Sequence, residues 1–323
     1  MSDKQKNLIV RTISGVFFIA IMVTGLLMPV NMMALFTLIT TAAVWEYTGL
    51  VNNYVEKVQI NRFISTAAAG FLFLAMAAYT SNMCTAEVFI PYLLTIVYLF
   101  ISELYTKNED SLADWAYTMM AQMYIALPFS TINILAYQDN GGVTEFHAVL
   151  PLCVFIFLWA NDTGAYCSGS LFGRHKLFPR ISPGKSWEGS IGGGILVLII
   201  AALVGYFTFC PETQGAGDYN SALANDLYDK YGCGWAAFSY HFAQIGSLSP
   251  LTSNIISWMG LGLVVVFFGT WGDLVESLIK RTIGIKDSGN VLPGHGGMLD
   301  RFDSSLMAIP ASVVYLYVLQ YFS

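Results

Sequence analysis

Residues 189–210 read GSIGGGILVLIIAALVGYFTFC and carry no charged side chain. A helix crosses the hydrocarbon core of a membrane with about 20 apolar residues, so this stretch is long enough to span one. The rest of the chain has the same character, with 55% hydrophobic and only 11% charged residues among 323. Ordinary soluble domains carry about 25% charged residues. The composition therefore predicts a chain that folds in lipid.

Eight further apolar runs are similar, and together they predict an all-α polytopic membrane protein with about nine transmembrane helices. The nine runs cover residues 8–30, 32–51, 63–80, 88–105, 112–136, 146–167, 189–210, 251–277 and 302–322. We divide the chain into residues 1–140, with about five spans, and residues 141–323, with the remaining spans and two charge-rich loops. The second and third runs have the least sharp bounds, so eight or ten helices stay open.

The distribution of lysine and arginine predicts the orientation of the chain. With a cytoplasmic N-terminus, fourteen of the fifteen Lys and Arg residues fall in cytoplasmic segments and only Lys230 falls outside. Cytoplasmic loops of membrane proteins are enriched in these residues. We therefore expect the N-terminus in the cytoplasm and the C-terminus outside. The charge-rich loops 168–188 and 278–301 then share the cytoplasmic face, as one composite site would require.

A first group of polar residues lies in GTWGDLVESLIKR, residues 269–281. Helical spacing places Asp273 and Lys280 on one face, with either Glu276 or Ser277 between them. A carboxylate at the end of a membrane span costs a few kcal/mol or more on insertion scales, so it should face water or a cation. A salt bridge between Glu276 and Lys280 on a solvated face is the simpler alternative, and it stays open.

A second group follows in DSGNVLPGHGGMLDRFD, residues 287–303. Its glycines leave the backbone free to approach a ligand and to expose N–H groups. Asp300 and Asp303 open the last helix three residues apart, where they share a face. A helix N-terminus favours phosphate, and two carboxylates there suit Mg²⁺, which binds one or two carboxylates beside phosphates. Capping by Asp300 alone would leave Arg301 and His295 unexplained.

A third group lies in NDTGAYCSGSLFGRHKLFPRISPGKSWEGS, residues 161–190. Asp162 sits at the cytoplasmic end of an apolar run, where an acid does not serve orientation. The cationic loop with Lys185 suits phosphates, although its charges could also do no more than fix topology, and no GxxxxGK[ST] P-loop is present. Glu46, in the second run, pairs with a cation or lines a cavity, and we favour structural pairing.

These groups together predict a reaction class. Carboxylates suit divalent cations, lysine and arginine suit polyanions, glycine-rich backbone suits phosphate, and the sequence offers no convincing covalent nucleophile. Phosphoryl or nucleotidyl transfer needs these parts, because positioning and charge neutralisation supply most of its catalysis. The cytoplasmic membrane face suggests one lipid partner and one soluble nucleotide.

Residues 277–303 closely resemble the signature of the phosphatidate cytidylyltransferases, also called CDP-diacylglycerol synthases. The matching residues are Ser277, Lys280, Arg281, Lys286, Asp287, Gly289, Leu292, Pro293, His295, Gly296, Gly297, Met298, Asp300, Arg301, Phe302 and Asp303. Residues 162–189 are also similar, although the pair of basic residues usual after the proline is Gly184–Lys185 here. The first 150 residues are similar only in being helical and apolar.

The resemblance implies transfer of CMP from CTP to phosphatidate in phospholipid biosynthesis, with Mg²⁺ and an open question over a second cation. It implies a catalytic region at 141–323, in the inner (cytoplasmic) membrane and facing the cytoplasm, and it maps the metal pair to Asp273 and Asp300. Further catalytic candidates are Lys280, Arg281, Lys286, His295 and Arg301, with Asp287 and Asp303 as metal ligands or supports. Substrate-binding candidates are Asp162, Lys185, Ser277, Gly296 and Gly297.

The expected partners are CTP and membrane phosphatidate, without nucleic acid, and a homodimer stays open. The nearest alternative is a membrane nucleotidyl- or phosphotransferase that acts on another lipid, such as a polyprenyl or ether lipid. A transporter with an ion site between broken helices is a different class. It is disfavoured because the ionisable residues cluster at the cytoplasmic ends of the runs and no repeat is found.

Overall fold

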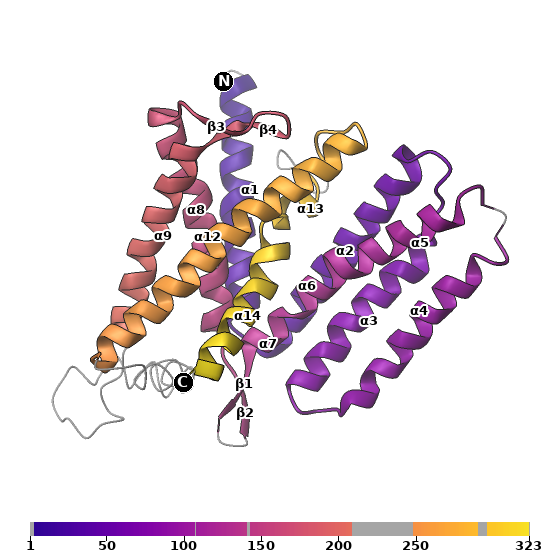
Figure 1. Ribbon diagram of the computed structural model, residues 1–323, viewed down its shortest axis with the longest axis horizontal. Helices are drawn as coiled ribbons and strands as arrows, with labels where there is room; N and C mark the ends of the chain where they lie inside the picture. The colour runs from indigo at the N-terminus through magenta and orange to yellow at the C-terminus, as the bar shows by residue number, and fades with distance from the viewer. Residues whose placement is uncertain (1–2, 107, 141–142, 209–247, 290–295, 323) are drawn as a thin grey trace. The chain divides into compact units, whose positions relative to one another are not determined.

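A computed structural model describes residues 3–106, 108–140, 143–208, 248–289 and 296–322, which are mostly helical (Figure 1). The chain forms two compact units. The first unit consists of Met1–Asn133 and Gly272–Leu306, and the second of Ile134–Trp271 and Met307–Ser323. Each unit is described on its own below.

The first unit is built from helices and short helical turns. Its elements are α1 (Asp3–Leu26), α2 (Pro29–Tyr54), α3 (Arg62–Thr80), the 3₁₀ turn η1 (Ala86–Phe89), α4 (Ile90–Ser102), α5 (Ser111–Met120), the π-helical turn η2 (Ala121–Ala126), α6 (Leu127–Ser130) and α13 (Leu299–Phe302). Polar caps set two of the helix starts. The Asn61 side chain accepts the N–H of Ile64 at 3.1 Å, and Asp110 accepts that of Ala113 at 3.0 Å. Such caps satisfy N–H groups that the first turn leaves unpaired.

Four phenylalanine side chains form the centre of the first unit: Phe36, Phe73, Phe129 and Phe302, all at most 1% exposed. Their ring centroids lie 6.3 Å apart for Phe36 and Phe73, 6.4 Å for Phe36 and Phe129, and 5.7 Å for Phe129 and Phe302. Aromatic pairs favour these offset and edge-on contacts. Because Phe302 ends α13, this packing fixes the short α13 against α2, α3 and α6.

The second unit contains two long helices and two short β-hairpins. Its elements are β1 (Tyr137–Asn140), β2 (Val143–Phe146), α8 (Val149–Phe172), β3 (Lys176–Phe178), β4 (Ser182–Ser186) and α9 (Trp187–Phe207). Both hairpins are antiparallel, with Tyr137 opposite Phe146 in the first and Lys176 opposite Ser186 in the second. Three helices continue from one unit into the other: α7 (Ile132–Ala136), α12 (Pro250–Thr282) and α14 (Ser305–Phe322).

Small residues let α8 and α9 lie side by side in close contact (Figure 1). A Cβ added to Gly164 would lie 2.9 Å from the Cα of Gly193, and one added to Gly193 would lie 2.6 Å from the carbonyl oxygen of Asn161. Membrane helices associate through such small residues, because apolar side chains gain little by leaving lipid for a neighbouring helix. The backbones of α8 and α9 therefore approach closely at Gly164 and Gly193, which allows van der Waals contact between the two helices.

The predicted apolar runs are largely helical where the structure describes them. Seven described helical segments are long and apolar enough to cross a membrane, and the shorter apolar helices Ser14–Leu26 and Ala86–Ser102 match the two remaining runs. The prediction of a mainly helical polytopic membrane protein is confirmed at this level. The number nine and the orientation of the termini stay predictions. The two short hairpins were not predicted.

Two helices continue beyond the apolar runs that predicted them. The run 146–167 belongs to α8, which ends at Phe172, and the run 251–277 belongs to α12, which ends at Thr282. Hydropathy marks the part of a helix that suits lipid and does not mark where hydrogen bonding stops. Asp162 therefore lies within α8, ten residues before its end, and the predicted loop 168–188 consists largely of a helix end and a hairpin.

Candidate functional site

Lys280 lies between two carboxylates near the end of α12. Its Nζ is 2.5 Å from Glu276 Oε2 and 2.6 Å from Asp300 Oδ1. Glu276 comes four residues before Lys280, so helical geometry brings the two side chains together. The side chains of Glu276, Lys280 and Asp300 are only 0%, 13% and 7% exposed. The pair expected on a solvated face is therefore present but buried, where each charge depends on its partner.

Asp300 is held by three donors at the start of α13. One carboxylate oxygen accepts Lys280, and the other accepts the N–H groups of Ser288 and Gly297, each at 2.9 Å. Gly296 precedes this contact with φ +86°, and a Cβ there would lie 2.7 Å from Asp300 Oδ2. A residue without a Cβ is required for that approach. The loop glycines thus bring the backbone close to Asp300.

Glu46 reaches the same loop from α2. Its carboxylate accepts the hydroxyl of Ser288 and the N–H groups of Met298 and Leu299, the last two at 2.8 and 3.1 Å. A carboxylate at a helix N-terminus satisfies backbone donors that have no partner within the helix. Glu46 is therefore paired, as favoured, but its partners here are two backbone N–H groups and a serine hydroxyl in place of the expected cation.

Asp273 lies on the same helix as Lys280, two turns earlier. Its Oδ1 accepts the hydroxyl of Ser277 at 3.2 Å, as their spacing of four residues predicts. The charges of Asp273 and Asp300 both act on Glu276, so the three carboxylates share one region of the first unit. We call four residues the Lys280 cluster: Asp273, Glu276, Lys280 and Asp300.

Asp303 lies in the turn between α13 and α14. Its Oδ1 accepts the N–H of Ser304 at 2.5 Å. A Cβ added to Gly272 would lie 2.7 Å from the carbonyl oxygen of Asp303, so α12 and this turn are in close contact. The expected start of one last helix is therefore a short helix, a turn and a longer helix. Asp300 is in the short helix and Asp303 follows it.

The other charged candidates of this segment lie at the surface. Arg281, Lys286, Asp287 and Arg301 are exposed. Arg281 donates to the carbonyl oxygen of Ile285 at 3.3 Å. Exposed cations can meet an approaching polyanion, whereas Glu276, Lys280 and Asp300 are buried and paired with one another. His295 lies outside the described residues.

The carboxylate oxygens of the Lys280 cluster are suitable ligands for Mg²⁺, because Mg²⁺ prefers hard oxygen ligands. Such sites use one or two carboxylates, and phosphates and water complete the coordination. Within the described part of the chain, no three His, Cys, Asp or Glu side chains converge as a ready-made metal site. Lys280 Nζ is instead the cation that two of these carboxylates share.

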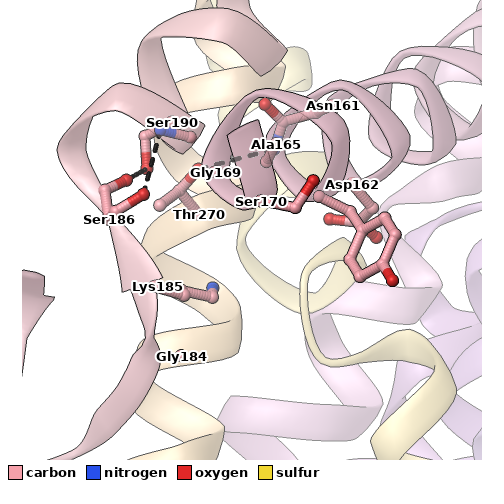
Figure 2. Close-up of a pocket in the computed structure, with 12 residues that line it drawn as sticks. Asn161, Asp162, Ala165, Gly169, Ser170, Gly184, Lys185, Ser186, Ser190 and Thr270 are labelled. Carbon is pink, nitrogen blue, oxygen red and sulfur yellow. Dashed lines mark hydrogen bonds between the residues drawn. The ribbon is translucent and has the colours of Figure 1, made fainter. Parts of the chain in front are cut away.

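A pocket of about 340 Å³ opens in the second unit, between α8, β4 and the start of α9. Figure 2 shows two of the lining residues, Lys185 on β4 and Asp162 on α8. Ser170, Ser190 and Thr270 add hydroxyl groups to the lining. The two substrate-binding candidates of this region, 23 residues apart in sequence, are therefore brought to one cavity. Its mixture of one cation, one carboxylate and several hydroxyls suits a polar, phosphorylated ligand.

Glu188 organises the hairpin that carries Lys185. Its carboxylate accepts the N–H groups of Arg174 and His175, each at 3.2 Å, and lies 2.6 Å from the Nδ1 of His175. Ser186 caps α9 by accepting the N–H of Gly189 at 3.1 Å. The β3–β4 hairpin is therefore tied to the first turn of α9 by side chains of that turn.

Sequence reasoning did not assign Glu276, Ser288 or Glu188 to the site. The i, i+4 spacing of Glu276 and Lys280 was a usable signal, but burial of the pair was not visible in it. Ser288 and Glu188 are surrounded by polar residues, so no periodic pattern marks them. Their roles depend on contacts that only the folded chain makes.

Comparison with known proteins gives a consistent result. Residues 9–319 match the cytidylyltransferase family. A phosphatidate cytidylyltransferase of Haemophilus influenzae is 29% identical over 96% of this chain and 99% of its own length. One of Staphylococcus haemolyticus is 30% identical over 93% of this chain and 96% of its own. One of Staphylococcus aureus strain COL is 34% identical over 64% of this chain and 60% of its own length. With a match over nearly its whole length, this chain belongs to the cytidylyltransferase family.

Proposed function

We propose that this chain transfers CMP from CTP to phosphatidate, giving CDP-diacylglycerol and pyrophosphate. The observation that carries the proposal is the Lys280 cluster. It joins Lys280 and Asp300, which lie in the signature shared with phosphatidate cytidylyltransferases, to Glu276 and Asp273 just before it. Two relatives with that name match almost the whole of this chain, and the match covers almost the whole of each relative. Phospholipid biosynthesis is the process in which such a product is used.

The reaction is an in-line displacement at phosphorus. A phosphate oxygen of phosphatidate forms a bond to the α-phosphorus of CTP, and the bond from that phosphorus to the β-phosphate oxygen breaks. Pyrophosphate leaves with the electron pair. The attacking oxygen is already an anion at neutral pH, so the step needs no general base and no net proton transfer. Positioning and neutralisation of charge are what the protein must provide.

The residues of the first unit divide this work by their exposure. The exposed Arg281, Lys286 and Arg301 are placed to attract the polyphosphate and the lipid phosphate. Asp273 and Asp300 would hold Mg²⁺, which supplies charge neutralisation to the reacting phosphates. Lys280 pairs with Asp300 at 2.6 Å and so orients its carboxylate. His295 stays a candidate for binding a phosphate oxygen.

The pocket of the second unit is proposed to bind part of the nucleotide. Lys185 supplies a positive charge for a phosphate, and the hydroxyls of Ser170 and Ser190 can donate to ribose or phosphate oxygens. Asp162 can accept from the ribose hydroxyls or the cytosine amino group.

The location follows from the same reasoning. The chain has several helices able to cross a membrane, and its relatives come from bacteria. We place it in the inner membrane with the charge-rich segments facing the cytoplasm, where CTP is available. The asymmetry of lysine and arginine supports this orientation.

Product analysis with purified protein tests the proposal. The protein in detergent is mixed with CTP labelled at the α-phosphate, Mg²⁺ and phosphatidate, and the lipid and aqueous products are separated. Label in CDP-diacylglycerol with an equal amount of pyrophosphate supports the proposal. Parallel reactions contain a polyprenyl phosphate or an ether-linked phosphatidate analogue in place of phosphatidate. Faster labelling of one of those lipids, or no labelled lipid at all, would overturn it.

A further inference from the structure

Glu46 is separated from the signature segment by more than 240 residues, yet it contacts that segment at three points. Its carboxylate accepts the N–H groups of Met298 and Leu299 and the hydroxyl of Ser288. The side chain is half-buried in α2, in a stretch whose neighbours Val44 and Tyr47 are fully buried. An acid among such residues is costly unless its oxygens are paired. These three donors supply that pairing.

Two glycines of the signature make room for this carboxylate. A Cβ added to Gly289 would lie 2.8 Å from Glu46 Oε2, and one added to Gly297 would lie 2.2 Å from Oε1. Both distances are shorter than a real Cβ contact, so any larger residue would push the carboxylate away. The glycines therefore serve the approach of Glu46 to the loop, in addition to any approach of substrate.

The contacts of Glu46 continue to the Lys280 cluster. Ser288 donates its hydroxyl to Glu46 and its N–H to Asp300, and it accepts the N–H of Asp300 at 3.3 Å. Asp300 in turn accepts Lys280 at 2.6 Å. One connected set of hydrogen bonds thus runs from α2 through the loop and the start of α13 to α12. Such networks fix side-chain positions more strongly than their separate contacts do.

The short length of α13 makes an outside anchor necessary. α13 spans only Leu299–Phe302, and one turn of helix is too short to be stable by itself. Phe302 fixes its far end through packing against Phe129, and Glu46 fixes its near end. Asp300 lies between these two anchors. Its position therefore depends on Glu46 in addition to its own contacts with Lys280, Ser288 and Gly297.

We propose that Glu46 is a positioning residue, which sets the orientation of the Asp300 carboxylate for CMP transfer through the N-terminus of α13 and through Ser288. The inference rests on the proposed function. In this proposal Glu46 acts through Ser288 and the N–H groups of Met298 and Leu299, and needs no contact of its own with substrate or metal. A catalytic carboxylate that is misplaced by about 1 Å costs on the order of a hundredfold in rate. Loss of Glu46 should therefore reduce turnover with a smaller effect on CTP binding.

The test measures kcat, KM for CTP and the Mg²⁺ concentration that gives the half-maximal rate. The amount of folded protein, determined by size-exclusion chromatography, is used to calculate kcat. Glu46→Ala is expected to lower kcat by roughly 10- to 100-fold and to raise the half-maximal Mg²⁺ concentration. Glu46→Gln keeps the side-chain length and one acceptor oxygen, so its kcat should be intermediate. Glu56→Ala, which removes an exposed acid just after α2, is the matched control and should behave as wild type.

A double-mutant cycle separates positioning from general damage and does not require Glu46→Ala to fold well. Gly289→Ala adds one methyl group against the Glu46 carboxylate and should lower kcat in the wild-type chain. In the Glu46→Gln or Glu46→Ala chain the same change should cost clearly less, because the contact it disturbs is already weakened. If the losses in kcat of the two single variants simply add in the double variant, the proposal is overturned. It is also overturned if the two single variants, Glu46→Gln and Gly289→Ala, both keep the wild-type kcat and Mg²⁺ response. A wild-type protein that makes no CDP-diacylglycerol would instead overturn the proposed function.

Discussion

The ammonium group of Lys280 lies 2.6 Å from a carboxylate oxygen of Asp300 and 2.5 Å from one of Glu276. One buried cation thus joins the end of α12 to the start of α13. The cluster also contains Asp273, and the charges of Asp273 and Asp300 together exceed the single charge of Lys280, so the cluster has a net negative charge. A site of this sign attracts a further cation, and the cation in turn attracts phosphates.

Replacing Lys280 tests the energetic side of this relationship. Lys280→Met fills similar space but leaves Glu276, which is 0% exposed, without its partner. Breaking a buried pair in this way costs about 3–5 kcal/mol, so a clear drop in the melting temperature in detergent is expected. Arg281→Met, at the exposed neighbouring position, should leave the melting temperature within a degree or two of wild type, by the roughly 0.5 kcal/mol typical of surface changes. Equal melting temperatures for the two variants would contradict the burial of the pair.

Asp273 and Asp300 should differ when each is changed to asparagine. Asp273→Asn keeps a partner for Ser277 and should lower turnover about a hundredfold or more while the melting temperature stays near wild type. Asp300→Asn should lower both, because an amide cannot pair with Lys280 and accept two N–H groups as the carboxylate does. Activity and melting temperature are measured on the same preparations. Near-normal turnover of Asp273→Asn at saturating Mg²⁺ would remove Asp273 from the metal site.

Lys185 is expected to act on nucleotide affinity. Lys185→Ala removes the charge that lines the pocket of the second unit, and loss of a charged hydrogen bond to phosphate should raise KM for CTP about tenfold or more. Lys176→Ala, on the other strand of the same hairpin and exposed, serves as the control for a general loss of positive charge. The two variants are compared in initial-rate measurements over a range of CTP concentrations. An equal rise in both would assign the effect to overall electrostatics.

Adjacent glycines of α9 provide a test of helix packing. Gly193→Ala places a Cβ 2.6 Å from the backbone of Asn161, so α8 and α9 must move apart, at a cost of about 1–3 kcal/mol. Gly194→Ala meets only Val266 Cγ1, at 3.5 Å, which is ordinary contact. Thermal unfolding in detergent should therefore separate the two variants, with only Gly193→Ala destabilised. If both melt alike, close contact of the two backbones is not what holds the pair.

The sequence predicted most helices of this protein because a membrane span needs about 20 mostly apolar residues in a row, which is a local signal. Helical spacing placed Asp273 and Lys280 on one face with Glu276 or Ser277 between them. The structure joins Asp273 to Ser277 and Glu276 to Lys280. The signature also drew attention to Asp300 and the glycines around it. Their roles in metal or substrate binding stay predictions.

Contacts between distant segments could not be predicted in the same way. The meeting of Glu46 with Leu299 spans 253 residues, and no spacing rule relates them. Gly297 was interpreted as an approach for ligand, whereas here its N–H binds Asp300 and its Cα faces Glu46. The β3–β4 hairpin escaped prediction because its strands are short and lack an apolar alternation. Tertiary contacts with α9 stabilise it instead.

His147 predicts a pH dependence of stability that is independent of catalysis. Its side chain is 5% exposed, and its Nδ1 has no hydrogen-bond partner among the described residues. Burial lowers the pKa of the imidazole, while Glu145, 4.0 Å away, partly opposes this effect. The unfolded chain therefore takes up a proton near pH 6.5, before the folded chain does, and stability should fall as the pH drops below about 6.5. Above that pH both states are neutral and the contribution vanishes.

His147→Phe keeps a buried ring that cannot titrate, so the difference in melting temperature between variant and wild type should grow from pH 7.5 to pH 5. A difference that stays constant over this range would show that the folded and unfolded chains protonate His147 alike.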